Sequence, residues 1–416
     1  MLIILILILG VITPFLGLFW PPVMVTFFSL IPISIQLFPS ITIFGVQQSI
    51  FGVVALLSLP IMFIGALISF QKYFKFLWPL LLPVLALSIL SVLNAKISGF
   101  PMTNVIREAG GIFYFALMIS LCFVVSQSDY HWILKYVFIL NIIISLCICI
   151  SALLDFTVLK SVIRIDYRYR VERMSSFFLQ NPTDLGCYTL LFFSLTFTAL
   201  LKRNSICWAL LSLIYAFIIM ATYSLACIGG LFICMIVIYV LTKAYKKIWI
   251  WVTGAFSVLL ISIIMLSFKL YHSHLFDRVR GLGTGLDRFK IWDYCLKLIQ
   301  KKPILGYTTA MAKLNLEKYL ISVSSAHNAF LSWFLGYGII GFLLIAWILF
   351  WIGQKLFAMV KANDDIVSII SIGCFSYLIS LLFFGLTHSF TPNTLFLYPF
   401  WILSIIVIGS QQIKRE

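Results

Sequence analysis

Apolar segments of about 20 residues recur along most of this chain, and a helix needs roughly that length to cross the hydrocarbon core of a membrane. Hydrophobic residues make up 62% of the 416 residues, whereas charged residues make up only 10%. A β-barrel is excluded, because its strands are short and alternate apolar with polar residues. The sequence therefore predicts an all-α, polytopic transmembrane helical bundle.

The apolar segments predict one membrane domain over residues 1–416 with 12–13 spans. The lower count applies if the first two segments form one span and a half-buried hairpin, because Pro21 and Pro22 lie between them. The predicted spans lie near 2–19, 22–38, 44–69, 77–95, 111–127, 132–154, 185–201, 206–223, 226–242, 248–267, 329–352, 366–385 and 394–410.

The orientation of the bundle follows from Lys and Arg in short loops, which stay on the cytoplasmic side. Alternate connections carry such residues: Lys72 and Lys75, Lys202 and Arg203, Lys243 to Lys247, Lys355 and Lys361, and Lys414 and Arg415. These connections are predicted to be cytoplasmic. The outward side then receives residues 96–110, 155–184, 268–328 and 386–393.

Arginine is concentrated on the predicted outward side. Seven of the ten arginines lie in two stretches, Arg164 to Arg173 and Arg278 to Arg288. The long loop 268–328 also carries ten Lys and Arg against four Asp and Glu, although outward loops are usually poor in basic residues. Guanidinium groups bind phosphate through two parallel hydrogen bonds. The clusters therefore predict a site for a polyanion, with phosphate as the leading candidate.

The long outward loop contains a predicted amphipathic helix over residues 287–300. Four apolar side chains recur there at helical spacing, with Lys and Arg between them: Phe289, Trp292, Leu296 and Ile299. Pro303 and Gly306 are expected to close this helix, which should lie on or near the membrane. A passive surface anchor is the simpler interpretation of Lys297, Lys301 and Lys302.

The predicted spans are almost free of ionisable residues, since Asp155 at a membrane edge is the nearest acidic group. Ion-coupled transporters generally keep carboxylates or histidines inside the membrane, despite their cost. A flippase or other transporter is therefore disfavoured. The pair His272 and His274 with Asp277 is typical of solvated loop side chains, so we predict no metal site and no cofactor.

Several short motifs occur in a fixed order along the second half of the chain: Gly285-x-x-Arg288-x-x-x-Trp292, Lys302-Pro303-x-x-Gly306-Tyr307, His327-Asn328-x-x-Leu331 and Gly336-x-Gly338-Ile-x-Gly341, preceded by Arg173-Met-Ser-Ser-Phe177 to Asn181-Pro182-x-x-Leu185-Gly186. Together they resemble the motifs of the bacterial O-antigen ligase and O-antigen polymerase superfamily. The resemblance covers most of residues 170–345. The first 150 residues match only in hydropathy.

The resemblance implies an inverting, metal-independent glycosyltransferase of GT-C-like architecture in the bacterial inner membrane, with its active site facing the periplasm. The donor would be an oligosaccharide on undecaprenyl diphosphate, and the acceptor a sugar hydroxyl. Membrane lipids and a chain-length regulator protein are further candidate partners, and nucleic acid is not one.

Residue roles follow from the same resemblance. It assigns Arg288 to the donor diphosphate and His327 to the acceptor hydroxyl as general base. Nearby positive charge lowers the pKa of an imidazole, so His327 should remain neutral and able to accept a proton. The predicted substrate-binding residues are Arg278, Arg280, Arg173, Arg170, Arg168, Trp292 and Asn328.

The chain departs from the family pattern in the turn between two middle spans. Many members carry an arginine there, but this turn runs from Thr222 through Ser224 and Leu225 to Gly230 without one. Either an arginine from 164–173 replaces it, or the diphosphate is bound differently. Asn181 and Pro182 are expected to shape the start of the next span.

Four functions remain open at this point. We favour a polymerase that joins lipid-linked repeat units, mainly because of the element from Phe177 to Gly186. A ligase that transfers the finished glycan to lipid A core uses the same donor and is a close alternative. A flippase or transporter is the third possibility, and a scaffold that binds anionic lipid is the fourth, although a scaffold leaves His327 without a purpose.

Overall fold

A computed structural model describes the parts of the chain that position the functional site. The described residues are 40–43, 46–49, 78–97, 132–155, 164–166, 171–175, 181–222, 224–243, 282–319, 325–390 and 397–412, with the single positions 26, 29, 99, 119 and 179.

The described part of the chain is a helical bundle, as predicted. Six of its helices are long and apolar enough to cross a membrane: Trp78–Ile97, α5 (Ile133–Leu154), α6 (Pro182–Arg203), α8 (Leu225–Thr242), α13 (Ala329–Ala358) and α14 (Asp365–Gly385). Two shorter apolar helices, α7 (Ile206–Ala221) and α15 (Tyr398–Gln412), complete the bundle. The chain is therefore a multi-pass membrane protein.

Each predicted span that falls on described residues coincides with one of these eight helices. The predicted spans 2–19, 22–38, 44–69, 111–127 and 248–267 lie wholly or mostly outside the described residues. The total of 12–13 spans therefore stays a prediction.

The start of the predicted span 44–69 was wrong. Strand β1 (Ser40–Ile43) pairs antiparallel with β2 (Val46–Ser49), and Ile43 lies opposite Val46. Residues 46–49 therefore belong to a hairpin and not to a span. β-Branched residues flank the connection, and strands favour such residues because they fit a pleated surface. Hydropathy alone does not detect a hairpin of this kind.

Helix α6 is the centre of the bundle. It is buried along most of its length, and it packs against α7, α8 and α14. Small and hydroxylated residues allow this close approach, as is typical of helices in membranes. The Ser194 hydroxyl, for example, donates to the Gly373 carbonyl of α14 over 2.9 Å. The central position of α6 fixes both of its ends relative to α14.

Contacts at the two ends of α6 confirm how the connections are divided between the two faces. At one end Arg203 forms an ion pair with Asp365 over 2.6 Å, joining two connections that were predicted to be cytoplasmic. At the other end Asp184 lies 3.5 Å from His388, joining two that were predicted to face outward. The predicted pairing of these loops is therefore correct.

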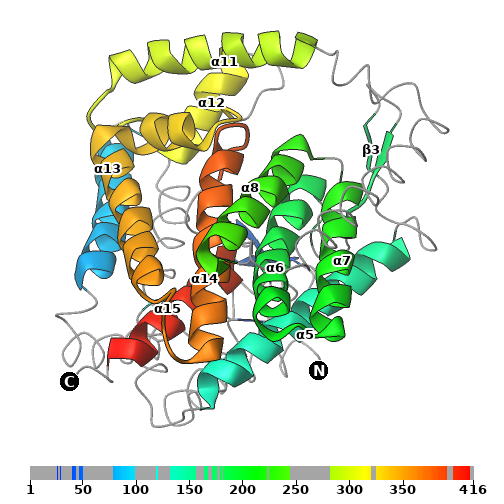
Figure 1. Cartoon of the computed structure of the whole chain (residues 1–416). Coiled ribbons are helices and arrows are strands. Elements are labelled where there is room, and N and C mark those ends of the chain that lie inside the picture. The colour runs from blue at the N-terminus through cyan, green and yellow to red at the C-terminus, as the bar shows by residue number, and fades with distance from the viewer. Residues whose placement is uncertain are drawn as a thin grey trace.

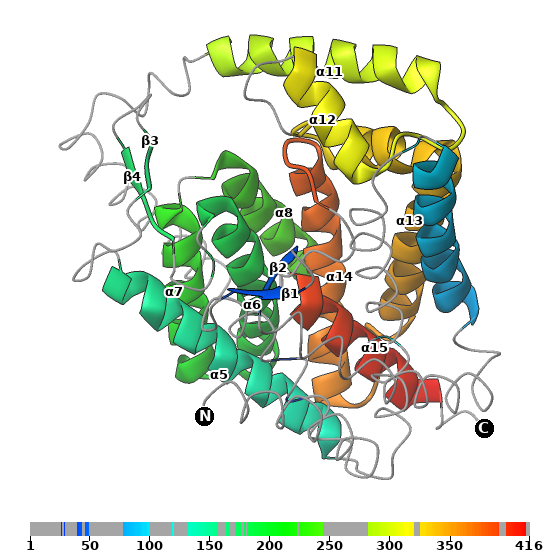
Figure 2. The same ribbon diagram turned by 180° about the vertical axis from the view of Figure 1, so that it is seen from behind.

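Helices α11 (Leu282–Lys301) and α12 (Thr309–Tyr319) cover the predicted outward end. Helix α11 lies across the ends of the bundle helices, with α12 between it and α13 (Figure 1). The hairpin of β3 (Arg164–Asp166) and β4 (Val171–Arg173) lies beside α7 at the same end (Figure 2). The described parts of both arginine stretches therefore gather at one end of the molecule.

The amphipathic helix predicted over residues 287–300 lies within α11, and its apolar residues are divided between the protein interior and the exposed surface. The residues that α11 buries are Ile291, Cys295, Leu298 and Ile299, which pack against α12, Ala326 and Leu335. Of the predicted apolar face, Phe289 is 64% exposed and Leu296 is 48% exposed. Two apolar stripes overlap on this helix, and only the packing of α12 decides which of them is buried. The exposed stripe suits the membrane interface.

Candidate functional site

His327 lies at the mouth of the bundle, one residue before the N-cap of α13. Its side chain is partly buried, and its backbone φ is +50°, in the left-handed region. That conformation is uncommon for a residue other than glycine and costs free energy. Such strain persists only where neighbouring contacts impose it, and it is frequent at functional sites.

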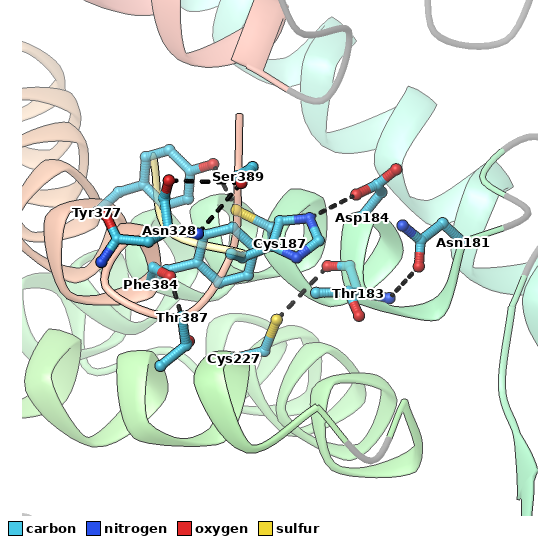
Figure 3. Close-up of polar contacts among 11 residues, drawn as sticks. Asn181, Thr183, Asp184, Cys187, Cys227, Asn328, Tyr377, Phe384, Thr387 and Ser389 are labelled. Atoms are coloured by element: carbon cyan, nitrogen blue, oxygen red, sulfur yellow. Dashed lines mark hydrogen bonds and ion pairs between the residues drawn. The ribbon is translucent and has the colours of Figure 1, made fainter. Parts of the chain in front are cut away.

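Asn328 supplies those contacts, because each of its polar groups forms a hydrogen bond within the protein. Figure 3 shows its bond to Ser389. Its side-chain oxygen accepts from the Leu331 N–H and caps α13, while its amide nitrogen donates to the Leu386 carbonyl over 3.1 Å. Its backbone N–H donates to the Ser389 hydroxyl over 3.1 Å. Asn328 therefore anchors the backbone that presents His327. The predicted contact of Asn328 with substrate stays a prediction.

Helix α11 is joined directly to the segment before His327. The Trp292 indole N–H donates to the Ala326 carbonyl over 3.0 Å. Arg288 precedes Trp292 by one helical turn, so both side chains project from the same side of α11. Trp292 thus fixes Arg288 relative to His327. A contact of the Trp292 ring with substrate stays a prediction.

The pKa of His327 is lowered from its ordinary value of 6.5. Burial is the largest cause, because it disfavours the charged imidazolium, and the charges of Arg288 and His388 add to it. The direction agrees with the prediction from sequence, but the sequence suggested neighbouring charge as the main cause. The side chain is therefore held as the neutral base.

The Asp184–His388 pair was not predicted to be part of the site. Asp184 lies in the first turn of α6, where Asn181 caps the helix by accepting from the Thr183 N–H and Pro182 is the first residue. His388 follows α14, and its ring packs on Phe384 with the centroids 4.7 Å apart. Asn181 and Pro182 shape the start of this helix, as expected. The sequence indicated this contact only indirectly, because loops 155–184 and 386–393 were both predicted to lie on the outward face.

The turn that lacks the family arginine lies next to the β3–β4 hairpin. Met174 follows Arg173 directly, and its backbone N–H donates to the Ala221 carbonyl at the end of α7 over 3.1 Å. The backbone of Arg173 therefore lies close to the turn that begins at Thr222. Arg168, Arg170, Arg278 and Arg280 lie outside the described residues, so their predicted roles stay predictions.

Within the described residues, no group of three or more His, Cys, Asp or Glu side chains is arranged to hold a metal ion. His272, His274 and Asp277 lie outside the described part of the chain.

A sequence model of the O-antigen ligase family matches residues 210–346. We call residues 210–346 the matched segment, because they are similar to that family. No curated protein matches the chain closely enough to count as a relative. Members of the family are membrane glycosyltransferases of the ligase or polymerase type.

The matched segment contains Arg288, Trp292, His327 and Asn328, whereas Asp184 and His388 lie outside it. Two motifs of this segment, residues 302–307 and 336–341, dock on one another. The Tyr307 N–H donates to the Leu335 carbonyl over 2.9 Å, and the Ile339 N–H donates to the Pro303 carbonyl over 2.9 Å. These bonds fix the end of α11 against α13.

Gly338 allows this docking because it breaks the helical conformation inside α13, with φ +64° and ψ −168°. A Cβ atom at this position would lie 2.1 Å from the Ile304 carbonyl oxygen. No side chain fits there unless the loop that follows α11 moves away. The close packing of α13 against the loop that follows α11 therefore explains the glycine at this position.

Gly338→Ala is expected to destabilise the protein far more than Gly99→Ala. Gly99 has nearly the same φ, +63°, but a Cβ there meets nothing within 4 Å. The substitution at Gly99 therefore costs only the free energy of placing alanine in the left-handed backbone conformation, roughly 1–2 kcal/mol. Thermal unfolding in detergent measures both variants. Equal decreases in the unfolding midpoint would show that the docking of the two motifs contributes little.

Proposed function

We propose that this protein is a polymerase of O-antigen or a related surface polysaccharide. It transfers glycan from undecaprenyl diphosphate to a sugar hydroxyl of another lipid-linked repeat unit. The observation that carries this proposal is the hydrogen bond from Trp292 to Ala326, which places the helix of Arg288 beside His327 inside the matched segment. The site would face the periplasm from the inner membrane.

In the proposed reaction the acceptor oxygen attacks the anomeric carbon of the donor sugar. The bond from that carbon to the diphosphate oxygen breaks, and the configuration at the carbon inverts. His327 takes the proton of the acceptor hydroxyl, while Arg288 stabilises the negative charge that develops on the departing diphosphate. A lowered pKa suits His327 for this step, because the imidazole must be neutral beforehand.

Arg173 is the strongest candidate for a second cationic group at the diphosphate. Its backbone lies beside the turn where other members of the family carry an arginine, because the next residue bonds to Ala221. The β3–β4 hairpin also lies at the same end of the bundle as α11 (Figure 2). Arg168, Arg170, Arg278 and Arg280 are further candidates from the same two stretches.

A ligase that transfers glycan to lipid A core is the second candidate, and the description of the matched family favours it. Polymerase and ligase share the donor and the chemistry, and they differ in the acceptor. The described part of the element from Phe177 to Gly186 begins α6 and brings Asp184 to the site. That role is compatible with both enzymes.

A transporter is less well supported. Among the residues whose burial is described, Asp155 is the one acidic or basic residue that is buried, and it lies at the end of α5. Helix α6 buries hydroxyl groups and no charged side chain, and those of Thr189, Ser194, Thr196 and Thr198 bond to backbone carbonyls. The described helices therefore lack the buried charged side chains that would line a path for a charged substrate.

Reconstitution of the full chain in liposomes tests the proposal. The host's lipid-linked repeat unit is supplied alone or together with lipid A core. We expect a ladder of longer lipid-linked glycans with the repeat unit alone, and we expect it to persist after exhaustive chelation. Product that requires lipid A core would identify the ligase. Absence of product under both conditions would overturn glycan transfer.

The rate should depend on pH through His327. Because the base must be neutral, kcat/KM should fall as the pH drops through the pKa of the free enzyme. That pKa is lowered, so the midpoint of the acid limb should lie below the ordinary value of 6.5. Initial rates of chain extension across pH 4.5 to 8, an interval that brackets the ordinary histidine pKa of about 6.5, measure it. A midpoint above that value would remove His327 as the neutral base.

A further inference from the structure

The Asp184–His388 pair brings two polar side chains from distant parts of the sequence to the mouth where His327 lies. Asp184 comes from the first turn of α6 and His388 from the segment that follows α14. Their atoms Oδ1 and Nε2 are 3.5 Å apart. His388 is also close enough to His327 for its charge to act on that imidazole. The pair therefore adjoins the proposed base, although both residues lie outside the matched segment.

Both side chains of the pair remain accessible to a ligand. Their exposed fractions are 30% for Asp184 and 22% for His388. The distance between them is that of an ion pair and is longer than a strong charge-assisted hydrogen bond. A carboxylate can accept about four hydrogen bonds, so Asp184 retains acceptor capacity beside His388. The pair can thus bind a further polar molecule.

The chain around the pair is fixed by the bundle. Ser389 hydrogen bonds to Ser332 over 2.8 Å, and the Trp333 indole N–H donates to the Phe390 carbonyl over 2.6 Å. These bonds attach the segment that follows α14 to the first turns of α13, which His327 directly precedes. The Asn181 cap fixes Asp184 in the same way at the start of α6. The pair is therefore pre-organised relative to His327, as a binding site requires.

The charges divide the site into two sides. Arg288 belongs to α11, which lies across the end of the bundle, whereas Asp184 and His388 belong to the bundle itself (Figure 1). The carboxylate of Asp184 repels a diphosphate but accepts hydrogen bonds from neutral hydroxyl groups. A carboxylate beside an imidazole therefore suits a sugar, and the guanidinium suits the lipid diphosphate.

We propose that Asp184 and His388 bind hydroxyl groups of the acceptor sugar and hold it against His327. This proposal rests on the proposed function, because it assigns the acceptor side of the same site. The proposal places the acceptor sugar on the side of His327 that Asp184 and His388 form, and the lipid diphosphate on the side of Arg288. It also assigns specificity for the acceptor to residues that lie outside the matched segment.

The test measures two ligands separately on the full chain in lipid nanodiscs. One probe is the repeat-unit oligosaccharide released from its lipid by mild acid, and the other is undecaprenyl diphosphate without sugar. Asp184→Asn and His388→Gln should each weaken binding of the oligosaccharide by about tenfold or more, the loss expected for a hydrogen bond to a charged group. Binding of undecaprenyl diphosphate should stay unchanged.

The Arg203–Asp365 pair provides a matched control, because it joins the same two helices at their opposite ends over 2.6 Å. Asp365→Asn should leave the affinity for both probes unchanged. If Asp184→Asn leaves binding of the oligosaccharide intact, or weakens both probes equally, the pair is a link between helices and the proposal is wrong. Failure of the unaltered protein to bind the oligosaccharide would also overturn it.

Turnover separates this proposal from the proposed function. If the unaltered protein extends chains while Asp184→Asn has an unchanged KM for the acceptor, the proposed glycan transfer is supported and the proposed acceptor site is wrong. If binding of the oligosaccharide depends on Asp184 but no product forms with any acceptor, the proposed sugar site is supported and the polymerase assignment is wrong. A raised KM with a nearly unchanged kcat supports both.

Discussion

Replacing His327 by Asn is expected to lower kcat for glycan transfer by about 10² to 10⁴, the usual contribution of a general base. The change removes the imidazole and preserves the backbone, because Asn tolerates the left-handed conformation better than most residues. His327 has φ +50°, so His327→Ala would add strain to the loss of the base. Asn at this position therefore isolates the chemistry from the fold.

Two measurements distinguish these effects. Thermal unfolding in detergent should give nearly the same midpoint for His327→Asn as for the unaltered protein, and a lower midpoint for His327→Ala. Initial rates of chain extension in liposomes should be low for both variants. If His327→Asn extends chains at the unaltered rate, His327 supports the backbone alone and another group accepts the proton.

The architecture of the bundle could be predicted because membrane spans depend on local composition. Helices such as α5 and α14 follow from apolar segments of sufficient length, whatever their neighbours are. The assignment of loops to two faces followed from Lys and Arg, and the ion pair of Arg203 with Asp365 agrees with it. The hairpin at residues 40–49 was missed because a short strand pair has no such signal.

The candidate site was only partly predictable. Motif spacing drew attention to Arg288 and His327, but the left-handed backbone of His327 arises from contacts of Asn328 with residues about 60 positions away. The Asp184–His388 pair depends on the packing of α6 against α14, which no local pattern encodes. The buried face of α11 depended in the same way on α12.

The glycine motifs illustrate a further limit. In the sequence they were part of the family resemblance, together with Arg288 and His327, and no role was assigned to them. Gly338 instead admits the backbone at Ile304, which attaches α11 to α13. A motif that accompanies candidate catalytic residues can therefore serve to position them.

Two substitutions of Arg288 should separate its charge from its geometry. Arg288→Gln removes the charge, and we expect kcat to fall by about 10² to 10³, the usual loss when one donor to a developing anion is removed. Because the charge of Arg288 lowers the pKa of His327, Arg288→Gln should also shift the acid limb of kcat/KM to higher pH. The two effects have one cause and should appear together.

Arg288→Lys keeps the charge but loses the planar pair of donors that matches a phosphate. The acid limb should therefore stay close to its original pH, while kcat should fall clearly below that of the unaltered protein. Lys290→Ala, an exposed position on the same helix, is the control and should change neither quantity. Full activity of Arg288→Lys would mean that charge alone is required. An unshifted acid limb in Arg288→Gln would mean that burial alone keeps His327 neutral, and Arg288 would then act on the diphosphate without tuning the base.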